Sequence, residues 1–252
     1  MLRALVEKEE RVDRDSPISV IIPCYNEAGS VAATLASIGS DKNVEVIVSD
    51  GGSGDETVKI CQRFNTRLIS GGRSRAECMN AGAAQATGQI LLFLHADSEL
   101  PADWAQEVRA SMGRPETLLG CFEFRPVSVA LQNSIALRLV TRLTNLRSRY
   151  LNLPYGDQGL FLRRGVFRAY GGFPSLPFME DFELVDRIRR SGGAGAVHTL
   201  RSEMRTSARR WEQQGVLRNS LVNQVIILGR QLGVPHSRLV GWYYGLTRRK
   251  TY

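Results

Sequence analysis

The sequence predicts an α/β fold in which a mostly parallel central sheet carries helices on both faces. Short apolar runs rich in β-branched residues occur at 18–22, 44–48 and 90–94, and such runs are typical of strands buried on both sides. Segments with apolar residues at helical spacing separate the runs, and this alternation indicates parallel pairing. Each run is followed by polar or turn-forming residues, which mark where the predicted strand ends.

The first half of the chain repeats this alternation in order. Val31, Leu35 and Ile38 have the spacing of one helix face, which predicts a helix over 28–38 between the first two strands. A short strand at 67–70 follows a helix at 57–64, and a helix at 74–86 leads into the strand at 90–94.

The residue pattern in the second half of the chain predicts a strand at 118–124, a strand ending at 162, a helix at 179–190 and a further strand before Thr206. A long helix is expected within 129–151, with leucines at helical spacing and arginines between them. Such a helix either packs its apolar stripe on its own domain with the arginines in water, or lies on an anionic membrane.

No linker rich in Pro, Gly or Ser divides the 252 residues. We expect one domain over 17–215, with a nucleotide-binding half at about 17–100 and an acceptor half at about 101–215. Residues 1–16 are mostly charged and predict a partly frayed extension. Residues 216–252 predict a helical tail that packs on the domain or at an interface.

Composition limits the partners. A net charge of +8 suits a nucleotide phosphate, a membrane surface or nucleic acid, but no recognition helix or aromatic-basic platform favours nucleic acid. Four cysteines without a CxxC pair indicate reduced thiols. No signal peptide or spanning apolar run is present, which predicts a cytoplasmic protein, with peripheral contact at the inner face of the membrane left open.

Three strand ends are expected to meet at one edge of the sheet. They carry the segments 23–27 (PCYNE), 50–55 (DGGSGD) and 95–97 (HAD). Ligands bind outside the carboxyl ends of the strands in such sheets. Turn chemistry alone explains any one of these loops, but three loops with carboxylates together favour a site for a ribose, a base edge or a divalent cation.

In their order and spacing, PCYNE, SDGGSGDET, NAGAAQATG and FLHAD resemble the signature of inverting family 2 glycosyltransferases, which have the GT-A fold. The later segments GDQGLF and MEDFEL resemble a bacterial subgroup of short, single-domain members. The resemblance covers about residues 17–215. It implies transfer of a sugar from a nucleotide diphosphate donor, with UDP as the family-level expectation, to a hydroxyl with inversion, helped by Mn²⁺ or Mg²⁺.

The resemblance also implies roles for single residues. Asp97 matches the metal-binding carboxylate of the family's DxD motif, and His95 stands where the first acid would be. His95 either contacts the nucleotide or the metal through a neutral imidazole, or packs at the strand end. The expected nucleotide-binding residues are Pro23, Tyr25, Glu27, Asp50, Gly51, Arg73, Arg75, Ala96 and Asp97. The two arginines begin a helix, where they either bind phosphate or form a solvated surface.

The family's ED motif corresponds to Glu180 and Asp181. The resemblance implies that Asp181 is the general base and that Glu180 shapes the site, with Asp157 as the substitute base. The expected sugar and acceptor side comprises Gly156, Asp157, Gln158, Arg209, Arg210 and Trp211. The last two resemble the end of the QxxRW block of processive relatives, but Ser207 stands in the Gln position, which departs from the processive pattern.

Two other functions fit parts of the sequence. A sugar-phosphate nucleotidyltransferase would carry a Gly-rich, Arg-containing loop after the first strand, where this chain has PCYNEAGS. A basic membrane-associated adaptor would explain the charge and the Arg-rich helix without catalysis. The acceptor, either lipid-linked or a small molecule, and the oligomeric state are not predicted.

Overall fold

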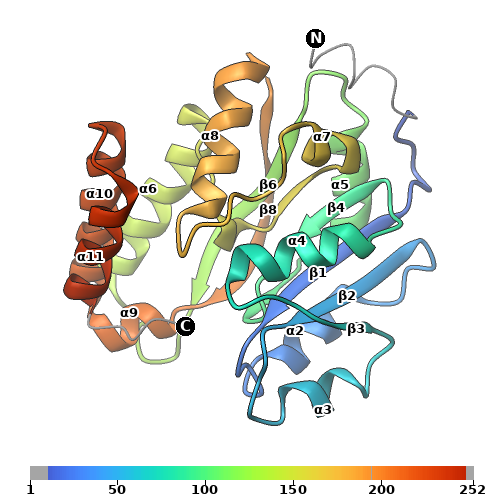
Figure 1. Ribbon diagram of the computed structural model, residues 1–252, viewed down its shortest axis with the longest axis horizontal. Helices are drawn as coiled ribbons and strands as arrows, with labels where there is room; N and C mark the ends of the chain where they lie inside the picture. Colours follow the sequence, from blue (N-terminus) through green and yellow to red (C-terminus); the bar gives the residue numbers. More distant parts are fainter. Residues whose placement is uncertain (1–10, 194, 248–252) are drawn as a thin grey trace. The chain divides into compact units, whose positions relative to one another are not determined.

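The computed structural model describes residues 11–193 and 195–247, and Figure 1 shows the course of the chain. The outer parts of the two predicted terminal segments, 1–10 and 248–252, lie outside the described residues. The strands are β1 Ile18–Cys24, β2 Val44–Asp50, β3 Arg67–Ser70, β4 Ile90–Phe93, β5 Ser98–Glu99, β6 Leu119–Val127, β7 Leu160–Arg163 and β8 Val197–Ser207.

The helices follow the predicted order, with additions at α5, α7, α9 and the short η1 that the sequence pattern did not indicate. They are α2 Val31–Ile38, α3 Thr57–Cys61, α4 Arg75–Gln85, α5 Trp104–Met112, α6 Ile135–Leu151, the 3-10 helix η1 Gly156–Gln158, α7 Arg164–Ala169, α8 Glu180–Gly192, α9 Arg209–Gln214, α10 Val216–Gln231 and α11 His236–Thr247. Among the described residues, no helix is both long and apolar enough to cross a membrane.

The strands form one mixed sheet in the order β3-β2-β1-β4-β7-β6-β8-β5. The first four are parallel to one another, as expected from the strand and helix alternation. β7 runs antiparallel to β4 and to β6, and β5 runs antiparallel to β8. The three parallel pairs β1–β2, β1–β4 and β2–β3 all come from the first half of the chain. An apolar run such as β7 can pair with β4 in a parallel or an antiparallel direction. Its sequence pattern therefore could not predict that β7 is antiparallel to β4.

Helices cover both faces of the sheet because successive side chains of a strand point to opposite faces. Val20 and Ile22 of β1 belong to a buried cluster with α2, α3 and α5. Ile21, between them, belongs to a second buried cluster with α4, α7 and α8. This two-sided burial confirms the predicted α/β architecture and explains the uninterrupted apolar runs.

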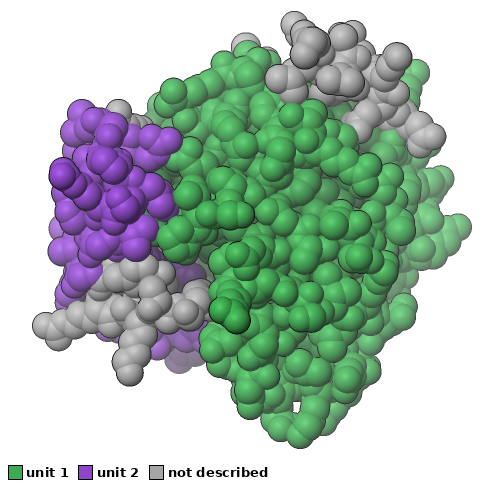
Figure 2. Space-filling model, viewed as in Figure 1, with its two compact units in different colours: residues 1–125, 145–206 green, residues 126–144, 207–252 purple. Residues whose placement is uncertain are grey.

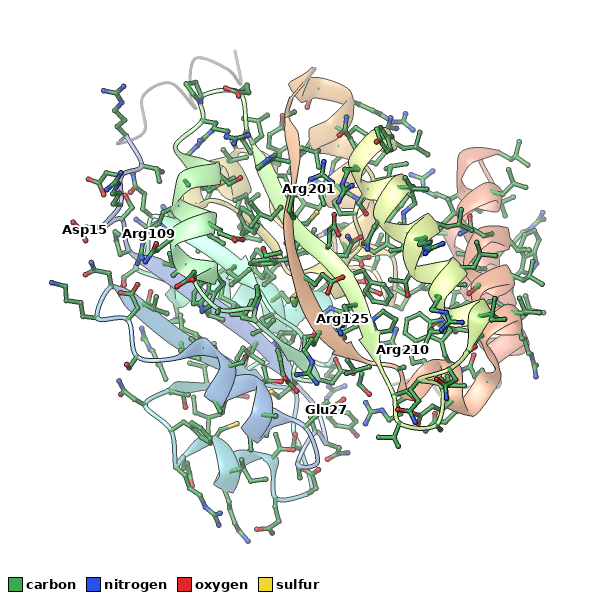
Figure 3. All side chains as sticks on the ribbon, turned by 180° about the vertical axis from the view of Figure 1, so that it is seen from behind. Asp15, Glu27, Arg109, Arg125, Arg201 and Arg210 are labelled. Atoms are coloured by element: carbon green, nitrogen blue, oxygen red, sulfur yellow. The ribbon has the colours of Figure 1, made fainter. Side chains whose placement is uncertain are left out.

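The chain folds as two compact units, shown in Figure 2. One comprises 1–125 and 145–206, and the other comprises 126–144 and 207–252. The predicted tail, 216–252, thus belongs to a unit that also takes in a distant internal segment. Within the larger unit, Arg109 of α5 donates from Nε to the Ser16 carbonyl (2.9 Å) and from Nη1 to Asp41 Oδ2 (2.7 Å), and the region is seen in Figure 3. The end of the predicted N-terminal extension is therefore held against α5.

Candidate active site

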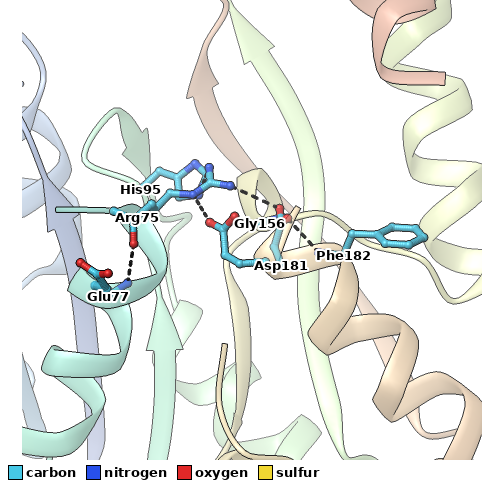
Figure 4. Close-up of polar contacts among 8 residues, drawn as sticks. Arg75, Glu77, His95, Gly156, Asp181 and Phe182 are labelled. Atoms are coloured by element: carbon cyan, nitrogen blue, oxygen red, sulfur yellow. Dashed lines mark hydrogen bonds and ion pairs between the residues drawn. The ribbon is translucent and has the colours of Figure 1, made fainter. Parts of the chain in front are cut away.

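Four charged or titratable side chains from distant segments meet beyond the carboxyl end of β4 (Figure 4). Arg75 begins α4, His95 follows β4, and Glu180 with Asp181 begins α8. The start of α4 is defined by Ser74, whose hydroxyl accepts the Glu77 amide at 3.2 Å. This is a normal N-cap interaction, and it directs the Arg75 side chain from the first turn into the cluster.

The Arg75 guanidinium holds the cluster together. Its Nε pairs with the Glu180 carboxylate, and its Nη2 lies 3.9 Å from Asp181 Oδ2. The Glu180 side chain is 1% exposed, and a carboxylate buried to this degree needs a charged partner. Arg75 Nη1 lies 3.5 Å from His95 Nε2. Because a guanidinium only donates, His95 Nε2 is the acceptor in any hydrogen bond between these two groups.

The Asp181 carboxylate is fixed by two backbone amides. Gly156 donates to Oδ2 at 2.7 Å, and Phe182 donates to Oδ1 at 2.8 Å. Burial raises the pKa of Asp181, but the positive charge of Arg75 and the two amide hydrogen bonds outweigh burial, so its pKa lies below the ordinary value. Asp181 is therefore ionised at neutral pH and able to accept a hydrogen bond.

Gly156 allows this close approach. A Cβ atom at this position would lie 2.8 Å from Asp181 Oδ2 and 3.2 Å from His95 Nε2. Both distances are shorter than ordinary contacts, so any larger residue would push the carboxylate or the imidazole aside. The predicted role of Gly156 on the sugar and acceptor side thus has a steric basis that the sequence did not show.

The rest of the GDQ segment forms η1. Gln158 is fully buried; its amide donates to the Phe122 carbonyl at 3.0 Å and its Oε1 accepts from Ser148 Oγ at 2.7 Å. These two hydrogen bonds thus hold η1 to the Phe122 backbone and to Ser148. Asp157 is partly exposed. The Arg147 guanidinium lies 3.4 Å from the Tyr155 ring centroid, a cation–π contact that holds the start of the loop.

The loops after β1 and β2 are joined by side-chain hydrogen bonds. Asn26, at a positive φ of 53°, accepts the Gly54 amide at 2.8 Å, and its own amide donates to Ser53 Oγ at 2.9 Å. Asp50 Oδ2 accepts the amides of Gly52 and Ser53, each at 2.9 Å. Gly51 donates to the Cys24 carbonyl at 2.8 Å. Asp50 therefore organises its own loop, and Asn26, which sequence reasoning used only as a strand end, joins the two loops.

The other predicted nucleotide-binding residues lie at the same strand ends. Tyr25 is 41% exposed, whereas Pro23 and Glu27 are partly buried. The Glu27 amide donates to Thr57 Oγ1 at 2.8 Å, and its carboxylate accepts from Ser30 Oγ at 2.9 Å. These contacts attach the β1 loop to the start of α3 and α2.

Arg73 and Ala96 differ in exposure. Arg73 is exposed, and its backbone amide donates to Glu77 Oε2 at 2.7 Å. Ala96 is buried, and its carbonyl accepts from Thr34 Oγ1 at 2.9 Å. That contact fixes the HAD loop against α2, on the face opposite α4.

The donor set for a metal can be tested on these residues. The described part of the chain contains no group of three or more His, Cys, Asp or Glu side chains placed to hold a metal ion. His95 Nε2 faces the Arg75 guanidinium, and this cation is unfavourable beside a metal. Asp97, partly buried after β4, offers one carboxylate. One carboxylate completed by substrate phosphates and water fits Mg²⁺ or Mn²⁺.

Arg209, Arg210 and Trp211 belong to α9 in the second unit. Both arginines are exposed, whereas Trp211 is only 8% exposed. A buried indole is typical of packing rather than of a sugar platform.

Comparison with solved structures defines the class of fold. The mannosyltransferase PcManGT from Pyrobaculum calidifontis, solved with GDP-Man and Mn²⁺, is 20% identical with a TM-score of 0.61 over 89% of this chain and 69% of that chain. Glucosyl-3-phosphoglycerate synthase from Mycobacterium tuberculosis, solved with Mn²⁺, UDP and glucosyl-3-phosphoglycerate, is 19% identical with a TM-score of 0.57 over 93% and 84%. The chain thus has the GT-A fold of glycosyltransferases.

Sequence comparison gives the family. The model of glycosyl transferase family 2 matches residues 19–171, and the chain belongs to this family. A PGL/p-HBAD biosynthesis glycosyltransferase from Mycobacterium tuberculosis is 39% identical over 175 residues, which cover 62% of each chain. Glycosyltransferase AglE from Haloferax volcanii is 34% identical over 184 residues, 63% of this chain and 56% of that protein. The chain therefore spans about three fifths of the length of these relatives. The resemblance inferred from the motifs is confirmed.

Proposed function

We propose that this chain is an inverting glycosyltransferase that moves a sugar from a nucleotide diphosphate donor, most simply a UDP-sugar, to an acceptor hydroxyl. Family membership supports the reaction class. The observation that carries the proposal is the ionised Asp181 carboxylate, fixed by two amides and faced by a guanidinium at the carboxyl end of the sheet. Such an arrangement offers a base and a phosphate-binding cation side by side.

The proposed reaction proceeds by in-line displacement. Asp181 takes the proton of the acceptor hydroxyl while the acceptor oxygen attacks the anomeric carbon. The bond between that carbon and the diphosphate oxygen breaks, and its electron pair leaves with the nucleoside diphosphate, which inverts the anomeric configuration. Asp157 is the substitute base.

Arg75 has two roles in this proposal. In the structure its charge lowers the pKa of Asp181, which weakens the carboxylate as a base. A donor diphosphate would compete for the guanidinium, and withdrawal of Arg75 would raise the pKa of Asp181 toward that of a useful base. Donor binding would thereby prepare the base.

The nucleotide is assigned to the joined loops after β1 and β2. Glu27 and Asp50 would hold the base and ribose, with Pro23, Tyr25 and Gly51 forming the wall, and Arg73 would contact phosphate. Asp97 would hold Mn²⁺ or Mg²⁺, which when bound supplies positive charge that stabilises the departing diphosphate. Arg209 and Arg210 are assigned to the acceptor or diphosphate side.

The test is product analysis on the whole chain. UDP-sugars and GDP-sugars are each incubated with a panel of lipid-linked and small-molecule acceptors, with Mn²⁺ or with EDTA. We expect nucleoside diphosphate to be released in step with a new glycoside of inverted configuration, and only with metal. Pyrophosphate as product would identify a nucleotidyltransferase. Absence of any nucleotide-dependent rise in melting temperature, with or without Mn²⁺, would favour the non-enzymatic adaptor.

A further inference from the structure

The positive charge of the chain is concentrated in the second unit. The sequence of 126–144 and 207–252 contains ten Lys and Arg residues and a single acid, Glu212, whereas the whole chain has 33 basic and 25 acidic residues. The larger unit is therefore nearly neutral. A protein surface with almost no acidic side chains attracts an anionic partner.

The same unit exposes an unusual amount of apolar surface. In α10, Val216, Val222 and Ile226 are buried, which accounts for one face of the helix. The opposite side is also apolar: Leu217 and Leu221 are 67% and 65% exposed. The apolar residues exposed along α10 and its end are Leu217, Leu221, Val225, Leu228 and Leu232. A helix that is apolar on both faces is stable when its exposed apolar face contacts a partner or a membrane.

The beginning of α6 combines both features on one side. Ile135, Leu139 and Leu143 recur every four residues and are 75%, 55% and 55% exposed. Arg138 and Arg142 are exposed and stand three residues after Ile135 and Leu139, so they share that side of the helix. The apolar stripe predicted for this helix is thus exposed rather than packed on its own domain. It presents guanidinium groups among leucines.

Trp242 of α11 is a further exposed apolar side chain of this unit. A Cβ atom at Gly229 of α10 would lie 3.2 Å from the Trp242 ring, so the absent side chain lets the two helices pack closely. Trp242 is nevertheless 43% exposed, whereas Trp104 and Trp211 are 4% and 8% exposed. Partly exposed indoles are favoured at the level of lipid headgroups, where one edge is apolar and the other wet.

We propose that these exposed faces of α6, α10 and α11 dock on the surface of an anionic lipid bilayer. Lipid phosphates would pair with the arginines, and the leucines would enter the boundary between headgroups and acyl chains. A second copy of the chain fits less well. A two-fold interface sets the same patch against itself, so the exposed Arg138 and Arg142 of one copy would meet like charges of the other, in a unit whose sequence holds one acid.

Co-sedimentation of the full chain with vesicles tests the proposal. We expect binding to phosphatidylcholine vesicles that contain phosphatidylglycerol, at least about tenfold weaker binding to phosphatidylcholine alone, and release by high salt. Arg138→Gln/Arg142→Gln and, separately, Leu217→Ser/Leu221→Ser should each weaken binding by at least about fivefold. All four side chains are exposed, so these variants should fold, as circular dichroism would verify.

Two controls make the test specific. Arg63→Gln/Arg168→Gln removes the same charge from exposed positions of the larger unit and should leave vesicle binding unchanged. Lipids brominated in their acyl chains should quench part of the tryptophan fluorescence, and Trp242→Phe should abolish that quenching because the other indoles are buried.

Three results would overturn the proposal. Equal losses in the α6 variant and in the control would show that only overall charge matters. A dimer in light scattering with no vesicle binding would assign the surface to a second copy of the chain. Retention on an oligonucleotide without vesicle binding would assign it to nucleic acid.

Discussion

Arg75 and Glu180 form an ion pair across 105 residues of sequence, and this pair joins the start of α4 to the start of α8. The carboxylate is almost completely buried, whereas the guanidinium is a quarter exposed and also faces Asp181 and His95. The buried acid thus positions a cation that remains accessible to a ligand.

Asp181→Asn should reduce the transfer rate by about 10²- to 10⁴-fold, because the amide keeps the shape but cannot take a proton. Nucleotide binding should persist, measured as the rise in melting temperature with UDP and Mn²⁺. Asp186→Asn is the matched control, since Asp186 lies on the same helix and pairs with Arg189 and Arg190. An unchanged rate in Asp181→Asn would transfer the role of base to Asp157.

Arg75→Met should destabilise the fold by about 3 kcal/mol, because it leaves the Glu180 carboxylate buried without its partner. The double variant Arg75→Met/Glu180→Gln should recover most of the loss, since it removes the uncompensated charge. Urea unfolding of the four proteins in this cycle measures the coupling. Additive losses would show that the pair contributes nothing to stability.

The same substitution should change the pH dependence. The pKa of Asp181 is lowered in the fold, so its contribution to stability is present above the unfolded pKa and is lost as pH falls through the folded pKa. Arg75→Met removes the charge that opposes burial and should raise the pKa of Asp181. The acid limb of the rate profile should then move to higher pH, whereas the exposed-site variant Arg168→Met should keep the parent profile.

Gly156→Ala should lower the transfer rate by about tenfold or more, because the new methyl group would displace Asp181 or His95. Gly54→Ala is the matched control. A Cβ there meets nothing within 4 Å, although Gly54 lies in a predicted nucleotide loop. Kinetics of both variants, with circular dichroism as a check of folding, decide the point: equal rates would remove the steric argument for Gly156.

Asp97→Asn should weaken the response of the transfer rate to metal. If Asp97 is the protein's carboxylate ligand, the Mn²⁺ concentration for half-maximal activity should rise by about tenfold or more, since a neutral amide is a weaker ligand for a hard cation. Titration of activity with Mn²⁺ measures this. His95→Ala should change that concentration much less, because His95 Nε2 faces Arg75; a larger effect for His95 than for Asp97 would reverse the assignment.

Much of the site was predictable because its positions follow from local patterns. The runs that became β1, β2 and β4 are apolar over their length, and parallel strands place their carboxyl ends at one edge of the sheet. This rule located the loops that carry Glu27, Asp50 and Asp97, and the family resemblance singled out these three carboxylates within them. The resemblance to the family's ED motif identified Glu180 and Asp181, although two acids in the first turn of a helix are also explained by the helix dipole.

The sequence by itself determined the α/β class, the order of the early elements, the family and the strand ends that carry the candidate site. The class and the strand ends depend on residues near one another in the chain, and the family depends on the order and spacing of short motifs along it. Only the tertiary structure decided that Arg75 pairs with Glu180, that Gly156 leaves room for Asp181, that β7 reverses beside β4, and that the stripe of α6 is exposed. The physical reason is that burial and pairing depend on partners from distant segments, and neither periodicity nor motif spacing specifies those partners.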